Sequence, residues 1–223
     1  MINRFTNVVH VVRHGEVDNP EGVLYGRLAN FHLTGRGRQM ANLVAEHLAG
    51  EPVTTLRTSP LERARETMAP IAAKFPEVEL VIDDRLIEAD SLFQGKVFGH
   101  NNKALLDPRN WWLLRNPLRP SWGEPYRDIA HRMHAALNDA AFAAGEGGAA
   151  VLVSHQSPIW TLRCFVEGRS LVQLPTKRQC TLGSVTSFHF TDGRISDVTY
   201  AEPARSLLGA DANRAFSSGS NED

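Results

Sequence analysis

Five polar side chains lie next to apolar runs of this 223-residue sequence. Arg13 and His14 follow the run "NVVHVV", and His155 follows the run "AAVLVS". The other two are Arg63, in "SPLERARET", and Glu88, in "DDRLIEAD". Two arginines that converge on one point predict a doubly charged oxyanion such as phosphate as their ligand. A histidine beside them can attack phosphorus as a nucleophile, and a carboxylic acid can protonate the departing oxygen.

Each of these residues also has an ordinary explanation when it is taken alone. A single histidine at the end of a strand commonly faces solvent or caps a helix. An arginine in the first turn of a helix is commonly a surface residue, although it is mildly unfavourable against the helix dipole. A lone glutamate is commonly an exposed loop acid. The chemical interpretation therefore depends on whether the secondary structure brings the five side chains together.

The sequence alternates between strand and helix patterns, which predicts an α/β fold with a mainly parallel sheet. The nearly continuous valines at 8–12 are typical of a buried parallel strand. Turn and cap signals predict helix starts at Thr34 and at Ser59, where Pro60 would take the first helical position. The remaining predicted elements are strands at 53–58, 78–82 and 149–154, helices at 34–49, 59–75, 124–143 and 158–168, and a hairpin at 183–201 with an Asp192-Gly193 turn.

This order of elements predicts where the five side chains meet. In open α/β sheets, ligands bind beyond the carboxyl ends of the strands. The first and fourth predicted strands end in the two histidines, the second leads into the helix of Arg63, and the third leads to Glu88. We therefore expect all five at one edge of the sheet. Gly15, which has no side chain, is expected to let the backbone approach a ligand closely.

Residues 91–122 show no clear period and contain Trp111 and Trp112, so they are predicted to form a lid-like insertion over the site. The lid arginines Arg109 and Arg115 are expected to bind substrate. The tryptophans either accept an organic group of the substrate or only pack the lid onto the body. We expect residues 1–205 to form a single domain and residues 206–223 to form a polar C-terminal tail.

The composition narrows the class of partner and compartment. A net charge of −1 gives no indication of a nucleic-acid surface. No run approaches the roughly 20 apolar residues of a membrane span, and the N-terminus lacks the pattern of a signal peptide. Two cysteines without CxxC spacing favour a reducing cytoplasm. His131 and His134 have the helical spacing of metal ligands, but no third ligand is evident, so no metal site is predicted and a solvated helix face is expected.

The motifs "RHGEV", "SPLERARET", "RLIEADSLFQG" and "VLVSHQ" resemble those of branch 1 of the histidine phosphatase (phosphoglycerate mutase-like) superfamily. The resemblance implies a three-layer α/β/α sandwich of the phosphoglycerate mutase type. It implies that His14 is the nucleophile, that Glu88 is the proton donor, and that Arg13, Arg63 and a protonated His155 bind the phosphoryl group. The reaction would need no cofactor and no metal.

The resemblance also implies further substrate-binding positions, and at some of them this sequence departs from the family. "YGRLANFHLTG" resembles the glycine turn of the family, which assigns Gly26 and Arg27. Asn19 is one residue earlier than the asparagine of the family, and Gln156 replaces its usual glycine. Val17 stands where the family commonly has a hydroxyl residue.

The expected function is hydrolysis of a small phosphorylated metabolite through a phosphohistidine. Two alternatives stay open. One is phosphotransfer of the cofactor-dependent phosphoglycerate mutase type, and the other is a phospho-ligand binding protein without turnover. The expected partner is the small phosphorylated substrate, with no nucleic acid or membrane, and a homodimer is compatible with the sequence.

Overall fold

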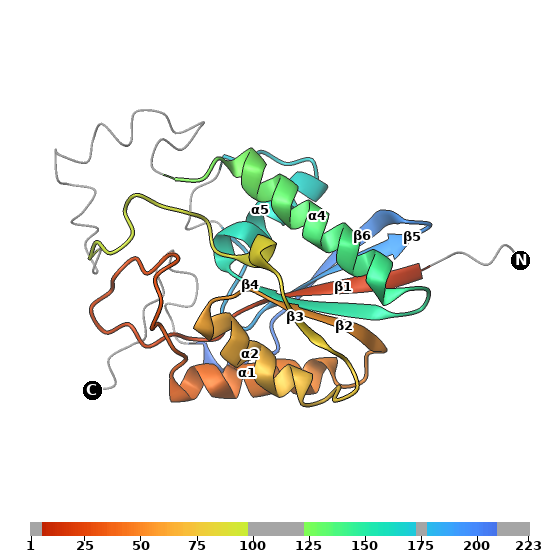
Figure 1. Cartoon of the computed structure of the whole chain (residues 1–223), viewed down its shortest axis with the longest axis horizontal. Coiled ribbons are helices and arrows are strands. Elements are labelled where there is room, and N and C mark those ends of the chain that lie inside the picture. The colour runs from red at the N-terminus through yellow and green to blue at the C-terminus, as the bar shows by residue number, and fades with distance from the viewer. Residues whose placement is uncertain (1–5, 98–122, 173–177, 209–223) are drawn as a thin grey trace, which may run out of the picture.

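The computed structural model describes residues 6–97, 123–172 and 178–208, and every structural statement below concerns this part of the chain. Strands and helices alternate as predicted, up to a final pair of strands (Figure 1). The elements are β1 (Thr6–Arg13), α1 (Gly35–Leu48), β2 (Val53–Thr58), α2 (Glu62–Ala72), β3 (Leu80–Ile82), the 3-10 helix η1 (Asp84–Leu86), α4 (Tyr126–Ala144), β4 (Ala149–Ser154), α5 (Gln156–Val166), β5 (Val185–Thr191), β6 (Arg194–Ala201) and the 3-10 helix η4 (Arg205–Leu207).

The sheet has six strands in the order β3-β2-β4-β1-β5-β6. The first four in that order are parallel to one another, whereas β5 is antiparallel to both β1 and β6. In the central pair, Arg13 of β1 lies opposite Ser154 of β4. The carboxyl ends of β1 and β4 are therefore adjacent, and the polar residues that follow them enter the same space. This confirms the predicted, mainly parallel α/β sheet.

Helices cover both faces of the sheet, which confirms the three-layer α/β/α sandwich (Figure 1). Successive residues of a strand point to opposite faces, and β1 follows this rule. Val9 and Val11 belong to the apolar cluster that contains Ile129 and Met133 of α4. Val12 belongs to the other cluster, with residues of α1 and α2. Both layers thus hold β1 in place, and its carboxyl end is correspondingly fixed.

Two of the three predicted cap and turn signals are confirmed. The Thr34 hydroxyl accepts a hydrogen bond from the Gly37 N–H at 2.9 Å and caps α1. The hairpin turn has φ angles of 52° and 72° at Asp192 and Gly193. The predicted cap at Ser59 is wrong, because α2 begins at Glu62 and Ser59 binds a histidine instead.

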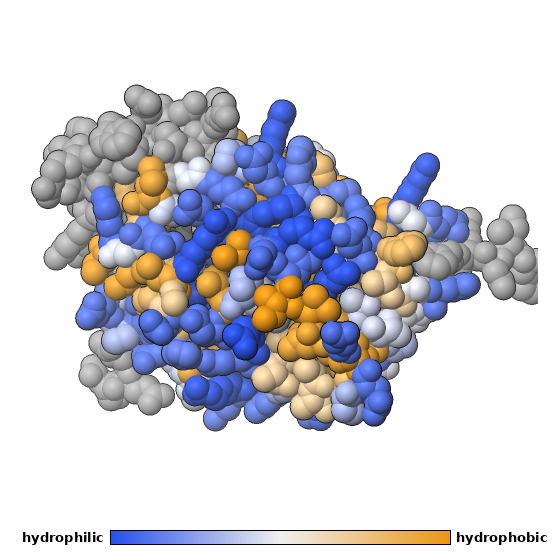
Figure 2. Space-filling model, in the orientation of Figure 1, coloured by the Kyte–Doolittle hydropathy of each residue, from blue (hydrophilic) through white to orange (hydrophobic). Residues whose placement is uncertain are grey.

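The surface of the sheet edge β3 is unusually apolar. Leu80, Val81 and Ile82 are 40%, 45% and 52% exposed, and Figure 2 shows apolar side chains gathered there on an otherwise largely hydrophilic face.

At the C-terminal end of the described residues, Leu207 and Leu208 pack against a small buried cluster. Within the described part, none of the helices combines the length and hydrophobicity that crossing a bilayer requires.

Candidate active site

The structure brings the five predicted side chains to one edge of the sheet. Arg13 is the last residue of β1, His14 directly follows it and His155 directly follows β4, and all three are almost fully buried. The rings of His14 and His155 lie 5.2 Å apart, centroid to centroid. Arg63, in the first turn of α2, is completely buried. Glu88 is half-buried in the loop after η1, where its charge acts on Arg63.

His14 is held in one tautomer by the backbone. Its Nδ1 lies 2.8 Å from the carbonyl oxygen of Gly15, and because a carbonyl only accepts hydrogen bonds, Nδ1 must carry the proton. The other nitrogen, Nε2, therefore keeps its lone pair. Burial, followed by the charges of Arg63 and Arg13, lowers the pKa of His14 well below its usual value of 6.5. The ring is neutral at pH 7, as a nucleophile requires.

Gly15 permits a close packing contact in addition to the expected approach to a ligand, which stays a prediction. A Cβ at this position would lie 2.4 Å from the carbonyl oxygen of Gly37, so the missing side chain lets the start of α1 pack on the loop after β1. The Gly15 N–H donates to the Thr67 hydroxyl at 3.1 Å, and that hydroxyl donates to the carbonyl of Arg63 at 2.7 Å. Thr67 thereby connects the His14 loop to the helix of Arg63.

Arg63 is a buried cation with unused hydrogen-bond donors. Its Nη2 donates to the carbonyl of Gly26 at 2.5 Å, while Nε and Nη1 have no hydrogen-bond partner among the described residues. Its guanidinium carbon lies 4.7 Å from the centre of the Tyr25 ring, which is cation–π distance. Burial lowers the pKa of Arg63. Since buried donors are normally paired, the two unused nitrogens indicate an anionic ligand.

His155 differs in charge from the form that the resemblance implies. Its Nε2 pairs with the Ser59 hydroxyl at 2.7 Å, and its Nδ1 is enclosed without a hydrogen-bond partner in the described part of the chain. Burial, followed by the charge of Arg63, lowers the pKa of His155 well below 6.5. The ring is therefore neutral at pH 7 rather than protonated. The same Ser59 that was expected to cap α2 thus contacts this histidine.

The carbonyl oxygen of Cys180 accepts hydrogen bonds from two of the predicted site residues. Nη1 of Arg13 donates to this oxygen at 2.6 Å, and Nε2 of Gln156 lies 3.5 Å from it. Gln156 is the first residue of α5 and is buried. These contacts fix Arg13 from the side of β5, which the sequence did not indicate.

The other predicted substrate-binding residues have partners within the protein. The Asn19 side chain exchanges two hydrogen bonds with the backbone of Val23, at 2.9 and 3.0 Å, and closes its own loop. Gly26 supplies the carbonyl that holds Arg63. Arg27 donates to the Glu88 carbonyl and to the Glu124 carboxylate. A substrate-binding role for these residues stays a prediction. Val17 packs in a small apolar cluster.

Two residues that the sequence did not single out join the site. Tyr25 packs under Arg63 and contacts His14 edge-on, with ring centroids 6.4 Å apart. Arg178 is half-buried, and its Nε is enclosed with no hydrogen-bond partner among the described residues. Burial lowers the pKa of Arg178 below its usual value, and the charge of Glu88 offsets only part of this shift. Tyr25 is the first residue of the quoted stretch "YGRLANFHLTG", whereas no pattern marks Arg178.

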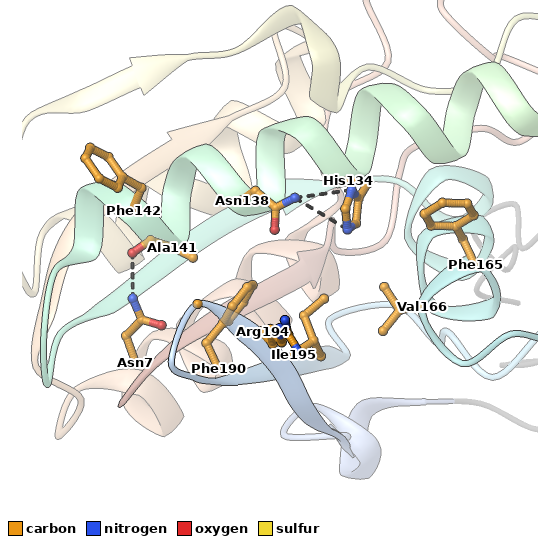
Figure 3. Close-up of a pocket in the computed structure, with 11 residues that line it drawn as sticks. Asn7, His134, Asn138, Ala141, Phe142, Phe165, Val166, Phe190, Arg194 and Ile195 are labelled. Carbon is orange, nitrogen blue, oxygen red and sulfur yellow. Dashed lines mark hydrogen bonds between the residues drawn. The ribbon is translucent and has the colours of Figure 1, made fainter. Parts of the chain in front are cut away.

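The predicted lid lies mostly outside the described residues. Arg109 and Arg115 fall in 98–122, outside the described residues. A separate cavity of about 600 Å³ lies between α4, α5 and the β5–β6 hairpin (Figure 3). Asn7, at the start of β1, lines this cavity, so the cavity opens at the end of the sheet opposite the candidate site.

His131 and His134 contact Phe165 edge-on. The described residues contain no group of three or more His, Cys, Asp or Glu suited to a metal ion.

Comparison with known proteins agrees with the site geometry. The chain is 50% identical over 196 residues to Rv0525 of Mycobacterium tuberculosis, which covers 88% of this chain and 96% of that one. It is 33% identical to a probable phosphoglycerate mutase GpmB of Photorhabdus laumondii, over 81% of this chain and 85% of the other. The structure of the mycobacterial glucosyl-3-phosphoglycerate phosphatase Rv2419c shares the fold, with a TM-score of 0.67 at 21% identity, covering 88% and 96% of the two chains.

The match to a family covers most of the chain and includes every residue of the candidate site that the structure describes. Residues 9–202 match the histidine phosphatase superfamily (branch 1). The proteins similar to this chain include a phosphatase and a probable mutase. Together with the phosphoglycerate mutase-like fold and the paired histidines, this match shows that the chain belongs to branch 1 of the histidine phosphatase superfamily.

Proposed function

We propose that this protein hydrolyses phosphomonoesters of small metabolites through a phosphohistidine on His14. The observation that carries the proposal is the juxtaposition of a neutral His14, fixed as the Nδ1–H tautomer, with the buried Arg63. A nucleophile with a free lone pair and a cation with unused donors are complementary to a phosphoryl group.

The first half of the reaction follows from these positions. Arg13 and Arg63 bind the phosphoryl oxygens, and the dianion beside His155 raises the pKa of that ring so that it can donate a hydrogen bond as well. Nε2 of His14 forms a bond to phosphorus while the P–O bond of the ester breaks. Glu88 gives its proton to the departing alkoxide, which leaves as an alcohol.

The second half regenerates the enzyme. The Glu88 carboxylate takes a proton from a water molecule, whose oxygen attacks phosphorus. The P–N bond breaks, inorganic phosphate leaves, and His14 is again neutral. Every group returns to its starting state, and the arginines neutralise the negative charge on the phosphoryl oxygens throughout.

Mutase-type phosphotransfer is the second candidate, because a probable phosphoglycerate mutase is among the relatives. A mutase must protect the phosphohistidine from water until the acceptor is in place. Hydrolysis is favoured here because the arginines of the predicted lid are dispersed in the sequence rather than adjacent.

The test is to trap the intermediate and to follow the product. Brief incubation with a phosphorylated substrate should leave acid-labile, base-stable phosphate on His14, and His14→Ala should have no turnover. A panel of phosphorylated metabolites, which includes 3-phosphoglycerate with and without its bisphosphate, separates release of phosphate from formation of an isomer. Binding without either product would indicate a phospho-ligand binding protein, and normal activity of His14→Ala would exclude the proposed nucleophile.

A further inference from the structure

The loop that carries Glu88 is held by its main chain from several directions. Four carbonyl groups of η1 and this loop, those of Arg85, Leu86, Glu88 and Asp90, accept hydrogen bonds from other parts of the fold. Their donors are Arg132 Nη1 at 2.5 Å, Ser154 Oγ at 2.7 Å, Arg27 Nε at 2.8 Å and the Glu124 N–H at 3.2 Å, in that order. The backbone of the loop is therefore fixed on both sides of Glu88.

Glu124 connects two of these donors through its side chain. Its Oε2 accepts from Nη2 of Arg27 at 2.8 Å and from Nη2 of Arg132 at 3.0 Å, and its Oε1 accepts from Nε of Arg132 at 2.8 Å. The side chains of Glu124 and Arg132 are each 16% exposed, and that of Arg27 is 32% exposed. Charge-assisted hydrogen bonds that are partly shielded from water are stronger than neutral ones at the surface.

The backbone places Glu124 close to the loop that it supports. Ser91 pairs with Gly123 in an isolated β-bridge. A Cβ on Gly123 would lie 2.2 Å from the carbonyl oxygen of Asp90, so only glycine permits this approach. The segment just before α4 therefore runs along the loop just after Glu88, and Arg132 reaches the same loop from the next turns of α4.

We propose that Glu124 is a positioning residue, which acts through Arg27 and Arg132 to hold the Glu88 carboxyl where it can protonate the leaving oxygen. This inference rests on the proposed function, because the position of Glu88 affects catalysis only if Glu88 is the proton donor. Without the carboxylate of Glu124, two neighbouring guanidinium groups lose the anion they share, and the loop between them loses its alignment. Displacement of a catalytic group by about 1 Å can cost about 10²-fold in rate.

The test compares substrates that need a proton on the leaving group with substrates that do not. Glu124→Gln keeps the size of the side chain but offers one acceptor oxygen to two arginines. The value of kcat/KM should fall about 10- to 10²-fold for an alkyl phosphate and should change little for 2,4-dinitrophenyl phosphate. Across a series of aryl phosphates, the dependence of the rate on leaving-group acidity should become steeper.

Glu167 provides a matched control. Its carboxylate also joins two arginines, Arg163 Nε at 2.8 Å and Arg169 Nη1 at 2.9 Å, but at the end of α5. Glu167→Gln should leave both rates and the leaving-group dependence unchanged. If Glu124→Gln does not fold, as judged by circular dichroism, Arg27→Lys is the substitute, because lysine keeps a cation for Glu124 but loses the Nε–H bond to the loop.

A double variant separates positioning from a general loss of structure. In the Glu88→Gln background the proton donor is already absent, so Glu124→Gln should add no further loss on the alkyl phosphate. Additive losses, or equal losses on both substrates, would overturn the inference while the proposed function stands. A wild-type enzyme without phosphatase activity would instead refute the proposed function, and an active enzyme that does not depend on Glu88 would refute the role of Glu88 on which the inference rests.

Discussion

At the scale of single residues, the site depends on how burial sets the charge of its histidines. His14 and His155 lie among cations, and both lose hydration on burial, so their neutral forms are favoured. The sequence identified both residues, and the family resemblance implied a protonated His155 beside the bound phosphoryl group. A sequence shows which side chain can titrate, whereas the direction of its pKa shift depends on groups that only the fold places beside it.

The first prediction concerns the protonation of these two rings. In the protein without added phosphate, nitrogen-resolved NMR should show His14 and His155 still neutral at pH 6, because both pKa values lie well below 6.5. His14 should show the Nδ1–H tautomer. Protonation of His14 near pH 6.5 would contradict the geometry of a neutral nucleophile.

The second prediction concerns the proton donor. Glu88→Gln should slow hydrolysis of alkyl phosphates by roughly 10²–10⁴-fold, the usual contribution of general acid catalysis. Activated aryl phosphates should be affected much less, since their leaving groups need no proton. The measurement is kcat/KM for both substrate types. Equal losses would mean that Glu88 has a different role or that another acid donates the proton.

At the scale of elements, close contacts between main-chain segments fix the loops that carry His14 and Glu88. The loop after β1 packs against the start of α1 at Gly15 and Gly37, and the segment before α4 packs against the loop after Glu88 at Gly123. The motif containing Gly15 was evident from the sequence, but its physical reason was not. Its partner Gly37 is 22 residues further along the chain, and nothing local signals the contact.

The third prediction tests this packing. Gly15→Ala places a methyl group 2.4 Å from the Gly37 carbonyl oxygen, so we expect the free energy of unfolding to fall by about 1–3 kcal/mol, the usual cost of overpacking. Turnover should fall as well, because the Gly15 carbonyl holds His14. Gly35→Ala is the control, since no atom lies within 4 Å of its added Cβ. Chemical denaturation and steady-state kinetics measure the two effects, and similar stability of the two variants would contradict the packing argument.

At the scale of the whole molecule, ion pairs connect the β3 edge of the sheet to helix α4. Asp83 follows β3 and accepts hydrogen bonds from Arg57 of β2 and from Arg85, which also binds Asp139 of α4. Burial raises the pKa of Asp83, but the hydrogen bonds and charge of Arg85, together with Arg57, outweigh this effect and lower it below 3.8. The carboxylate is therefore favoured in the folded protein.

The fourth prediction follows from this depressed pKa. A lower pKa in the folded state means that the stabilisation is present above pH 3.8 and is lost as the pH falls through the folded pKa. At pH 7, Asp83→Asn should reduce the free energy of unfolding by about 1.5–3 kcal/mol, the value of hydrogen bonds to a charged group. The difference from wild type should shrink in acid. Exposed Asp84 serves as the control, and an equal effect of Asp84→Asn in urea titrations would argue against the role of Asp83.

The sequence by itself determined the alternation of strands and helices, the mainly parallel sheet, and the residues that meet at its carboxyl edge. Those features follow from periodicity and from motifs at strand ends, which are local and therefore readable along the chain. Only the tertiary structure decided that Ser59 pairs with His155 rather than capping α2, and that Arg27, which binds the Glu88 carbonyl, also pairs with Glu124. These pairs are separated by 96 and 97 residues. Their contacts exist only because packing of the two helix layers on the sheet brings distant side chains within hydrogen-bond distance.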